Sequence, residues 1–240
     1  MTDHTAHNDE AHDPAPGQNH DRASGHAHDH DLDDSPPSAD EALALIRAQQ
    51  TALERDQLSG IPWILGVWGV AWSVGFLALW SGYEGGNPWF RLPLGLAAAI
   101  FGLLLIGSII VSAVIGMRLN RGVRGPSNFS GAVYGIAWPV VSLGAYLIGV
   151  ALALNGMDST LQTLYFPAIY ALVAGAMYLM GAALWRSIDQ LVLGAVIIVA
   201  GTVAPFFGAP TNNLVMAVLG GGAFLIAALV MHLGLKKGRS

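Results

Sequence analysis

The sequence predicts an all-α membrane protein with six transmembrane helices, and two observations carry this prediction. From Ile61 onward the chain runs in long uncharged apolar stretches, each close to the ~20 residues that a helix needs to cross the hydrocarbon core of a bilayer. Charge is scarce and unevenly placed. Only 11% of the residues are charged, against about 25% in a typical soluble domain, and thirteen of the sixteen Asp and Glu residues precede Gly60.

The first segment, residues 1–37, is rich in Asp, His and Pro and nearly free of large apolar side chains, a composition typical of disorder. Within it His26, His28 and His30 stand beside Asp residues and form a candidate site for Zn²⁺ or Ni²⁺. Because the alternating spacing is loose, we expect a solvated tail that binds metal only adventitiously. A functional metal site is the alternative, and no other cofactor is expected.

Residues 38–60 have the pattern of an amphipathic helix. Ser38 and Glu41 have the spacing of a capping box, Leu45 and Ile46 share one face, and Gly60 ends the segment. We expect this helix to lie at the cytoplasmic surface of the membrane. The alternative is that it docks on the loops of the membrane domain.

The membrane domain is expected to cover residues 61–235. Its predicted spans are residues 61–80, 92–117, 131–154, 164–185, 191–207 and 214–235. The last two spans come from one uncharged stretch that is more than twice as long as a bilayer core requires. Turn-forming residues cluster at its middle and divide it; they are Pro205, Gly208, Pro210, Asn212 and Asn213.

Six spans place both termini on one side of the membrane. Ten of the eleven Lys and Arg residues then fall on that side, and Arg91 alone falls on the other. Because basic residues are retained on the cytoplasmic side, the sequence predicts that both termini are cytoplasmic. Residues 236–240 then form a short basic cytoplasmic tail.

The spans are notable for lacking charge. No Asp, Glu, Lys or Arg falls inside a predicted span, whereas ion-coupled transporters usually place ionisable groups within the membrane. The sequence also has no HExxH, GxSxG or Walker A motif and no Cys, so we expect that the protein is not an enzyme. No basic patch with interleaved aromatic residues is present, so nucleic acid is not an expected partner.

Side chains in the spans suggest packing surfaces. Trp68, Trp72 and Phe76 follow one another at four-residue spacing, and Trp138 lies in the third span. We interpret them as a packing ridge, and the alternative is an apolar substrate groove. Small residues that let helix backbones approach closely recur in three spans: Gly66, Gly69 and Ser73; Ser108, Ser112 and Gly116; Gly131 and Gly135.

Two prolines interrupt the hydrogen bonding of predicted spans. Pro139 cannot donate to the carbonyl of Gly135, and Pro205 cannot donate to that of Gly201. Freed carbonyls at membrane depth need another partner. These four residues, together with Ser142 and Thr202, form a candidate polar pathway for a neutral solute. The alternative is that the two prolines only kink their helices.

Part of the chain also resembles a known family. The sequences ALALI at 42–46, QQ at 49–50, GVWGVAW at 66–72 and GF at 75–76 resemble an uncharacterised family of six-helix integral membrane proteins from actinobacteria. Some members of that family are loosely described as transporters. The resemblance is sharpest over residues 40–80, implies the bacterial plasma membrane, and carries over no site residues.

These features favour a transport-type protein with a neutral or apolar substrate. It would be a small permease or the membrane subunit of a larger transporter. The partners expected beyond the lipid bilayer are a separate ATPase subunit or further copies of the chain. The alternative is a membrane scaffold or regulator that binds a protein partner through the N-terminal region.

Overall fold

The structure is a computed structural model that describes residues 38–119 and 126–237. Every secondary-structure element in these residues is helical, and six helices are long and apolar enough to cross a membrane. The prediction of six apolar helices is therefore confirmed, and these helices indicate a multi-pass integral membrane protein. The predicted disordered tail, residues 1–37, with its candidate metal ligands His26, His28 and His30, lies outside the described residues.

The chain divides into two compact units, Met1–Leu43 and Ala44–Ser240. The described part of the first unit is the start of helix α1 (Ala39–Leu58). Its predicted capping box is present, because the backbone N–H of Ser38 donates to Glu41 Oε2 at 2.8 Å and the N–H of Glu41 donates to Ser38 Oγ at 3.3 Å. The hydrogen bond from the Ser38 backbone N–H to the carboxylate, and after it the Ser38 side chain, hold the pKa of Glu41 below its ordinary value.

The second unit contains the apolar helices. They are α2 (Ile61–Gly82), α3 (Leu94–Leu119), α4 (Pro126–Leu154), α5 (Ser159–Trp185) and α6 (Ile188–Val203), which continues into the 3₁₀ turn η1 (Ala204–Phe207). The sixth span is composite: α7 (Thr211–Val215), the π-helical turn η2 (Met216–Gly221) and α8 (Gly222–Lys237). Between the fifth and sixth spans Gly208 adopts φ +71°, a conformation that favours glycine, and so opens the predicted turn.

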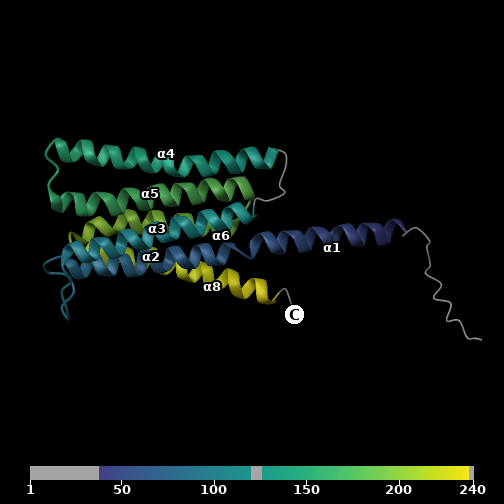
Figure 1. The fold of residues 1–240 in the computed structure, drawn as a ribbon, viewed down its shortest axis with the longest axis horizontal. Coiled ribbons are helices and arrows are strands. Elements are labelled where there is room, and N and C mark those ends of the chain that lie inside the picture. The colour runs from purple at the N-terminus through teal and green to yellow at the C-terminus, as the bar shows by residue number, and fades with distance from the viewer. Residues whose placement is uncertain (1–37, 120–125, 238–240) are drawn as a thin grey trace, which may run out of the picture. The chain divides into compact units, whose positions relative to one another are not determined.

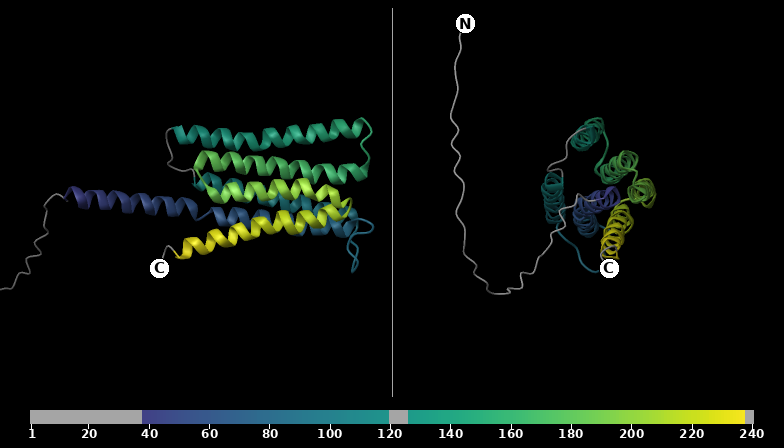
Figure 2. Two further views of the ribbon diagram at one scale, coloured as in Figure 1. Left: turned by 180° about the vertical axis from the view of Figure 1, so that it is seen from behind. Right: turned by 90° about the vertical axis from the view of Figure 1, so that its right-hand side faces the viewer.

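The helices of the second unit pack as a chain of neighbours that does not follow the sequence. Seen end-on, they form an arc in the order α3, α2, α8, α6, α5, α4 (Figure 2, right). Consecutive helices α3 and α4 stand at the two ends of this order. Figure 1 shows α4 lying beside α5 on one side of the bundle.

The last span joins two halves of the unit. Helices α2 and α3 pack on each other, and α4, α5 and α6 form a second packed group. Among the described elements, the two groups are connected mainly by the sixth span. Its elements α7, η2 and α8 pack on α2, and η2 and α8 also pack on α6. The final span therefore holds the two groups together.

Glycine allows the closest helix contacts. A Cβ on Gly175 of α5 would lie 2.8 Å from the carbonyl oxygen of Gly194 on α6, and a Cβ on Gly69 of α2 would lie 2.9 Å from the backbone nitrogen of Leu225 on α8. Such contacts let backbones approach as dispersion packing in lipid requires. The predicted small-residue surface is thus confirmed for Gly69. It is wrong within this chain for Gly131 and Gly135, where an added Cβ would meet open space because α4 turns these positions outward.

Aromatic rings fill the interior in an unbroken series. Neighbouring centroids are 4.7–6.2 Å apart, and every pair except the tilted Phe76–Phe101 pair meets edge to face, an attractive geometry. The series is Phe101, Phe76, Trp72, Phe224, Tyr178, Trp138, Tyr134 and Trp185. It runs from α3 through α2, α8 and α5 to α4, so it connects both halves of the unit.

The two end helices of the arc bury little of their surface. In the most apolar stretch of each helix, 6% of the residues of α3 and 11% of those of α4 are buried, against 44% of those of α2. Large apolar side chains such as Leu103 and Ile136 are exposed on them. In a membrane such surfaces are stable in contact with lipid, since acyl chains are as apolar as the side chains.

Candidate functional site

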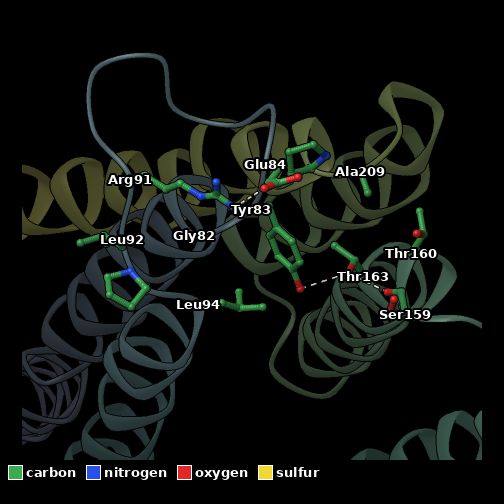
Figure 3. A pocket seen from close by; sticks show the side chains of 12 residues that line it. Gly82, Tyr83, Glu84, Arg91, Leu92, Leu94, Ser159, Thr160, Thr163 and Ala209 are labelled. Atoms are coloured by element: carbon green, nitrogen blue, oxygen red, sulfur yellow. Dashed lines mark hydrogen bonds and ion pairs between the residues drawn. The ribbon is translucent and has the colours of Figure 1, made fainter.

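A pocket of about 460 Å³ lies at one end of the bundle. That end, here called the mouth end, is formed by residues 83–93, 155–158 and 208–210, which connect the helices there. Figure 3 shows the pocket between the loop after α2, the start of α3, the start of α5 and the turn before α7. Its lining residues are Gly82, Tyr83, Glu84, Arg91, Leu92, Pro93, Leu94, Ser159, Thr160, Thr163, Ala209 and Pro210.

The pocket carries no net charge from its lining side chains. Glu84 and Arg91, both exposed, pair with each other at 3.0 Å. The remaining polar groups are hydroxyls of Ser159, Thr160 and Thr163 and the phenol of Tyr83. Hydroxyl groups both donate and accept hydrogen bonds, so this lining suits a neutral polar molecule better than an ion.

The loop after α2, residues 83–93, forms one wall of the pocket and is held in place by hydrogen bonds. Ser81, which is buried at the end of α2, accepts a hydrogen bond from Asn87 Nδ2 at 2.9 Å, and the carbonyl of Ser81 accepts from the N–H of Leu92, also at 2.9 Å. The hydroxyl groups of Tyr83 and Thr163 are hydrogen-bonded at 3.1 Å (Figure 3). The loop is thereby tied both to its own helix and to α5.

Thr163 also connects the pocket to the interior, and a proline explains how. Pro167 lies inside α5 and lacks the N–H that would donate to the carbonyl of Thr163 four residues earlier. Asn212 of the last span replaces that donor, because its Nδ2 lies 2.8 Å from the Thr163 carbonyl oxygen. A side chain from the sixth span therefore completes the hydrogen bonding of the fourth.

Asn212 and its neighbour Asn213 are buried, at 0% and 1% exposure. Within the described residues, Asn212 Oδ1 and Asn213 Nδ2 have no hydrogen-bond partner. A buried polar atom without a partner costs about 1–3 kcal/mol, so each such atom calls for an explanation. The interpretation of both residues as ordinary turn residues is wrong, since the chain has already entered the packed sixth span at Thr211.

The candidate pathway residues do not come together. Gly135, Pro139 and Ser142 lie on α4, and Gly135 and Pro139 are exposed. Gly201, Thr202 and Pro205 lie on α6 and η1, where Gly201 is buried against Ala171 of α5, and the exposed Thr202 hydroxyl donates to the Ile198 carbonyl at 2.8 Å. Because α4 and α6 pack on opposite sides of α5, the two groups do not line a common space. Their role in a pathway stays a prediction.

The aromatic residues singled out in the sequence lie in the packed interior. Trp72 and Phe76 are buried, and Trp68 and Trp138 pack against the same cluster. Trp68 Nε1 donates to Ser112 Oγ of α3 at 2.9 Å, which gives its one polar atom a partner. A substrate groove along these residues stays a prediction.

Sequence reasoning missed the Asn212–Thr163–Pro167 arrangement. The signal was present, because Pro167 stands inside an apolar run and leaves the carbonyl of Thr163 without its helical donor. The identity of the replacement donor depends on tertiary packing that no local pattern specifies.

No group of three or more His, Asp or Glu side chains that could hold a metal ion occurs in the part of the chain that the structure describes. Comparison with known proteins finds no matching protein-family model, no matching curated protein and no matching solved structure.

Proposed function

We propose that this protein is a non-enzymatic, transport-type integral membrane protein that admits a small neutral solute from the mouth end. One observation carries the proposal. The hydroxyl-lined pocket of about 460 Å³, whose lining side chains carry no net charge, adjoins, through Thr163, two buried amides with unpaired atoms in the sixth span. Polar side chains buried at the start of an apolar span are costly, and these two keep atoms without a partner among the described residues.

The charge distribution supports a neutral solute. Charged residues within the described spans are confined to end turns, as with Arg118 in α3 and Asp189 in α6. An ion crossing this body would meet no compensating charge at depth. A neutral molecule needs only hydrogen-bonding groups.

A permeability measurement tests the proposal without knowledge of the natural substrate. Protein reconstituted in liposomes should speed the uptake of small neutral probes, here glycerol and acetamide, measured by stopped-flow light scattering after an osmotic step. Thr160→Trp fills the pocket and should return the rate toward that of empty liposomes. Asn155→Leu, at the same end but outside the pocket lining, serves as the matched control. If wild type and empty liposomes take up both probes equally, the proposal is wrong.

The proposal includes a sidedness. If the chain crosses the membrane six times, ten of its eleven basic residues fall on the side of the termini, which supports cytoplasmic termini in a bacterial plasma membrane. A phosphatase reporter that works only outside the cytoplasm, fused after Ser240, should be inactive, and a cytoplasmic fluorescent reporter at that position should be bright. The opposite pair of results would reverse the orientation and place the mouth end inside.

A scaffold role is the second candidate, favoured by the small buried share of α3 and α4. In that case crosslinking in native membranes should recover a specific protein partner that is lost when residues 38–60 are deleted. Retention of the partner after this deletion would count against binding through the N-terminal region.

A further inference from the structure

The two buried asparagines differ from the two buried serines of the described spans. Ser81 and Ser108 are also buried, but their hydroxyls donate to the carbonyls of Leu77 and Leu104, within their own helices. Asn212 offers a free acceptor, Oδ1, and Asn213 a free donor, Nδ2. One acceptor and one donor, both buried, are what a neutral hydrogen-bonding group requires of its site.

The position of the acceptor is fixed by packing. Because Nδ2 of Asn212 donates to the carbonyl of Thr163 at 2.8 Å, the planar amide cannot rotate freely, and its Oδ1 keeps one direction. Since successive residues of a helix are about 100° apart, the Asn213 amide faces a different neighbour. Both atoms nevertheless belong to consecutive residues of α7, at the start of the sixth span.

A continuous set of residues connects this point to the pocket. Thr163 lines the pocket, and its carbonyl is the partner of Asn212. On the other flank Ala209 and Pro210 also line the pocket, and the N–H of Asn213 donates to the Pro210 carbonyl at 3.0 Å. Both asparagines are thus bonded directly to pocket-lining residues.

We propose that Asn212 Oδ1 and Asn213 Nδ2 form an inner polar subsite, reached from the mouth-end pocket, for a small neutral molecule that carries both a hydrogen-bond donor and an acceptor. A hydroxyl group, a primary amide and water share this chemistry. The inference rests on the proposed function for the route of the molecule, but binding at the subsite is measured separately. A neutral occupant is favoured over an ion because the charged side chains that line the pocket, Glu84 and Arg91, pair with each other and leave no net charge.

A protection experiment measures binding. The chain has no Cys, so Thr160→Cys supplies a single thiol in the pocket wall. Glycerol or acetamide bound in the pocket and subsite should slow its reaction with a water-soluble maleimide. Asn213→Leu should raise the half-protecting probe concentration by about tenfold, the effect of one lost hydrogen bond.

Asn212 also has a structural role, so its variant needs a matched background. Pro167→Ala restores the N–H that can donate to the Thr163 carbonyl. In that background Asn212→Leu removes the free acceptor without leaving the carbonyl unpaired, and it should raise the half-protecting concentration by a similar factor. Pro167→Ala alone and Asn155→Leu should leave it unchanged. Equal protection in all variants, or no protection in the Thr160→Cys parent, would overturn the subsite.

The permeability of the same variants separates this inference from the proposed function. If glycerol protects the thiol in an Asn213-dependent way but wild type speeds no uptake, transport fails and the subsite stands. If wild type speeds uptake and neither asparagine variant alters uptake or protection, the subsite fails and transport stands. Osmotic water permeability shows whether the occupant is water or a solute. If the asparagine variants change the water flux and leave the uptake of both solutes unchanged, water is the occupant.

Discussion

At the scale of single residues, the contact between Asn212 and the Thr163 carbonyl joins the fourth and sixth spans. In water a freed carbonyl can be hydrated, but at this buried position it needs a protein partner. The same amide therefore has two tasks: one end completes α5, and the other end, Oδ1, is free.

A double-mutant cycle tests the structural task. Asn212→Ala should lower the free energy of unfolding by about 1–3 kcal/mol, because the Thr163 carbonyl is left buried and unpaired. In the Pro167→Ala background the same change should cost less, because the restored helical N–H takes its place. Thermal unfolding in detergent, followed by tryptophan fluorescence, provides both values. Equal costs in the two backgrounds would mean that proline and asparagine are not coupled.

Glycine substitutions test the packing of α5 on α6. Gly175→Ala places a Cβ against the side chain of Ile198 and 2.8 Å from the Gly194 carbonyl oxygen, so backbone must shift, and stability should fall by about 1–3 kcal/mol. Gly107→Ala is the matched control, because open space surrounds its Cβ position in α3. Its stability should be unchanged or up to about 1 kcal/mol higher. The loss of thermal stability should appear in the first variant only.

At the scale of elements, the start of α1 gives a pH dependence. The hydrogen bonds from Ser38 lower the pKa of Glu41 from its ordinary value of 4.5. Because the folded pKa is the lower one, the carboxylate's support of the helix start is present above the ordinary pKa and is lost as the pH falls through the lowered value. An NMR titration of full-length protein labelled at glutamate should show Glu41 titrating below 4.5. Ser38→Ala keeps the backbone N–H that lowers the pKa most and removes only the side-chain contribution, so it should move the midpoint part of the way back toward 4.5. An unchanged midpoint would remove the Ser38 side chain as a cause.

The sequence could predict the apolar helices because length and hydropathy decide whether a segment crosses a bilayer. The capping box was readable for a similar reason, as it depends on two residues three apart. The composite sixth span was not readable. Its π-helical turn lies where Gly221 packs against Ser73 of α2, and the Ser73 hydroxyl donates to the Ala217 carbonyl at 3.3 Å. Because this π-helical turn is stabilised by contacts with α2, which is distant in the sequence, the residues of the turn themselves carry no pattern that predicts it.

At the scale of the whole membrane unit, the order of helices around the arc could not be predicted either. Helices such as α3 are apolar on nearly every side, so hydropathy does not indicate which side faces protein. The candidate pathway residues of α4 and of α6 with η1 form one group in the sequence because each set contains a proline, yet α5 lies between them. The pocket escaped prediction because its walls come from four separate parts of the chain.

The exposed surfaces of α3 and α4 predict where lipid contacts the protein. Spin labels at Leu103, 70% exposed, and Ile136, 62% exposed, should be strongly accessible to oxygen dissolved in the bilayer. A label at Phe224, 2% exposed, should be protected from oxygen. A label at Gly107, whose Cβ position meets open space, serves as a third lipid-facing position. Electron paramagnetic resonance power saturation gives each accessibility. Protection at both Leu103 and Ile136 would mean that protein covers these faces.

The bridging position of the sixth span has a consequence for biogenesis. As the nascent polypeptide leaves the ribosome, α3 can pack on α2, and α5 and α6 can later pack with α4. Few contacts fix the position of one of these groups relative to the other. Residues 211–237 emerge after both groups and pack between α2 and α6. A stalled or truncated product that stops before Thr211 would therefore consist of two loosely tethered helix clusters, recognisable to quality-control proteases by their exposed glycine and aromatic faces.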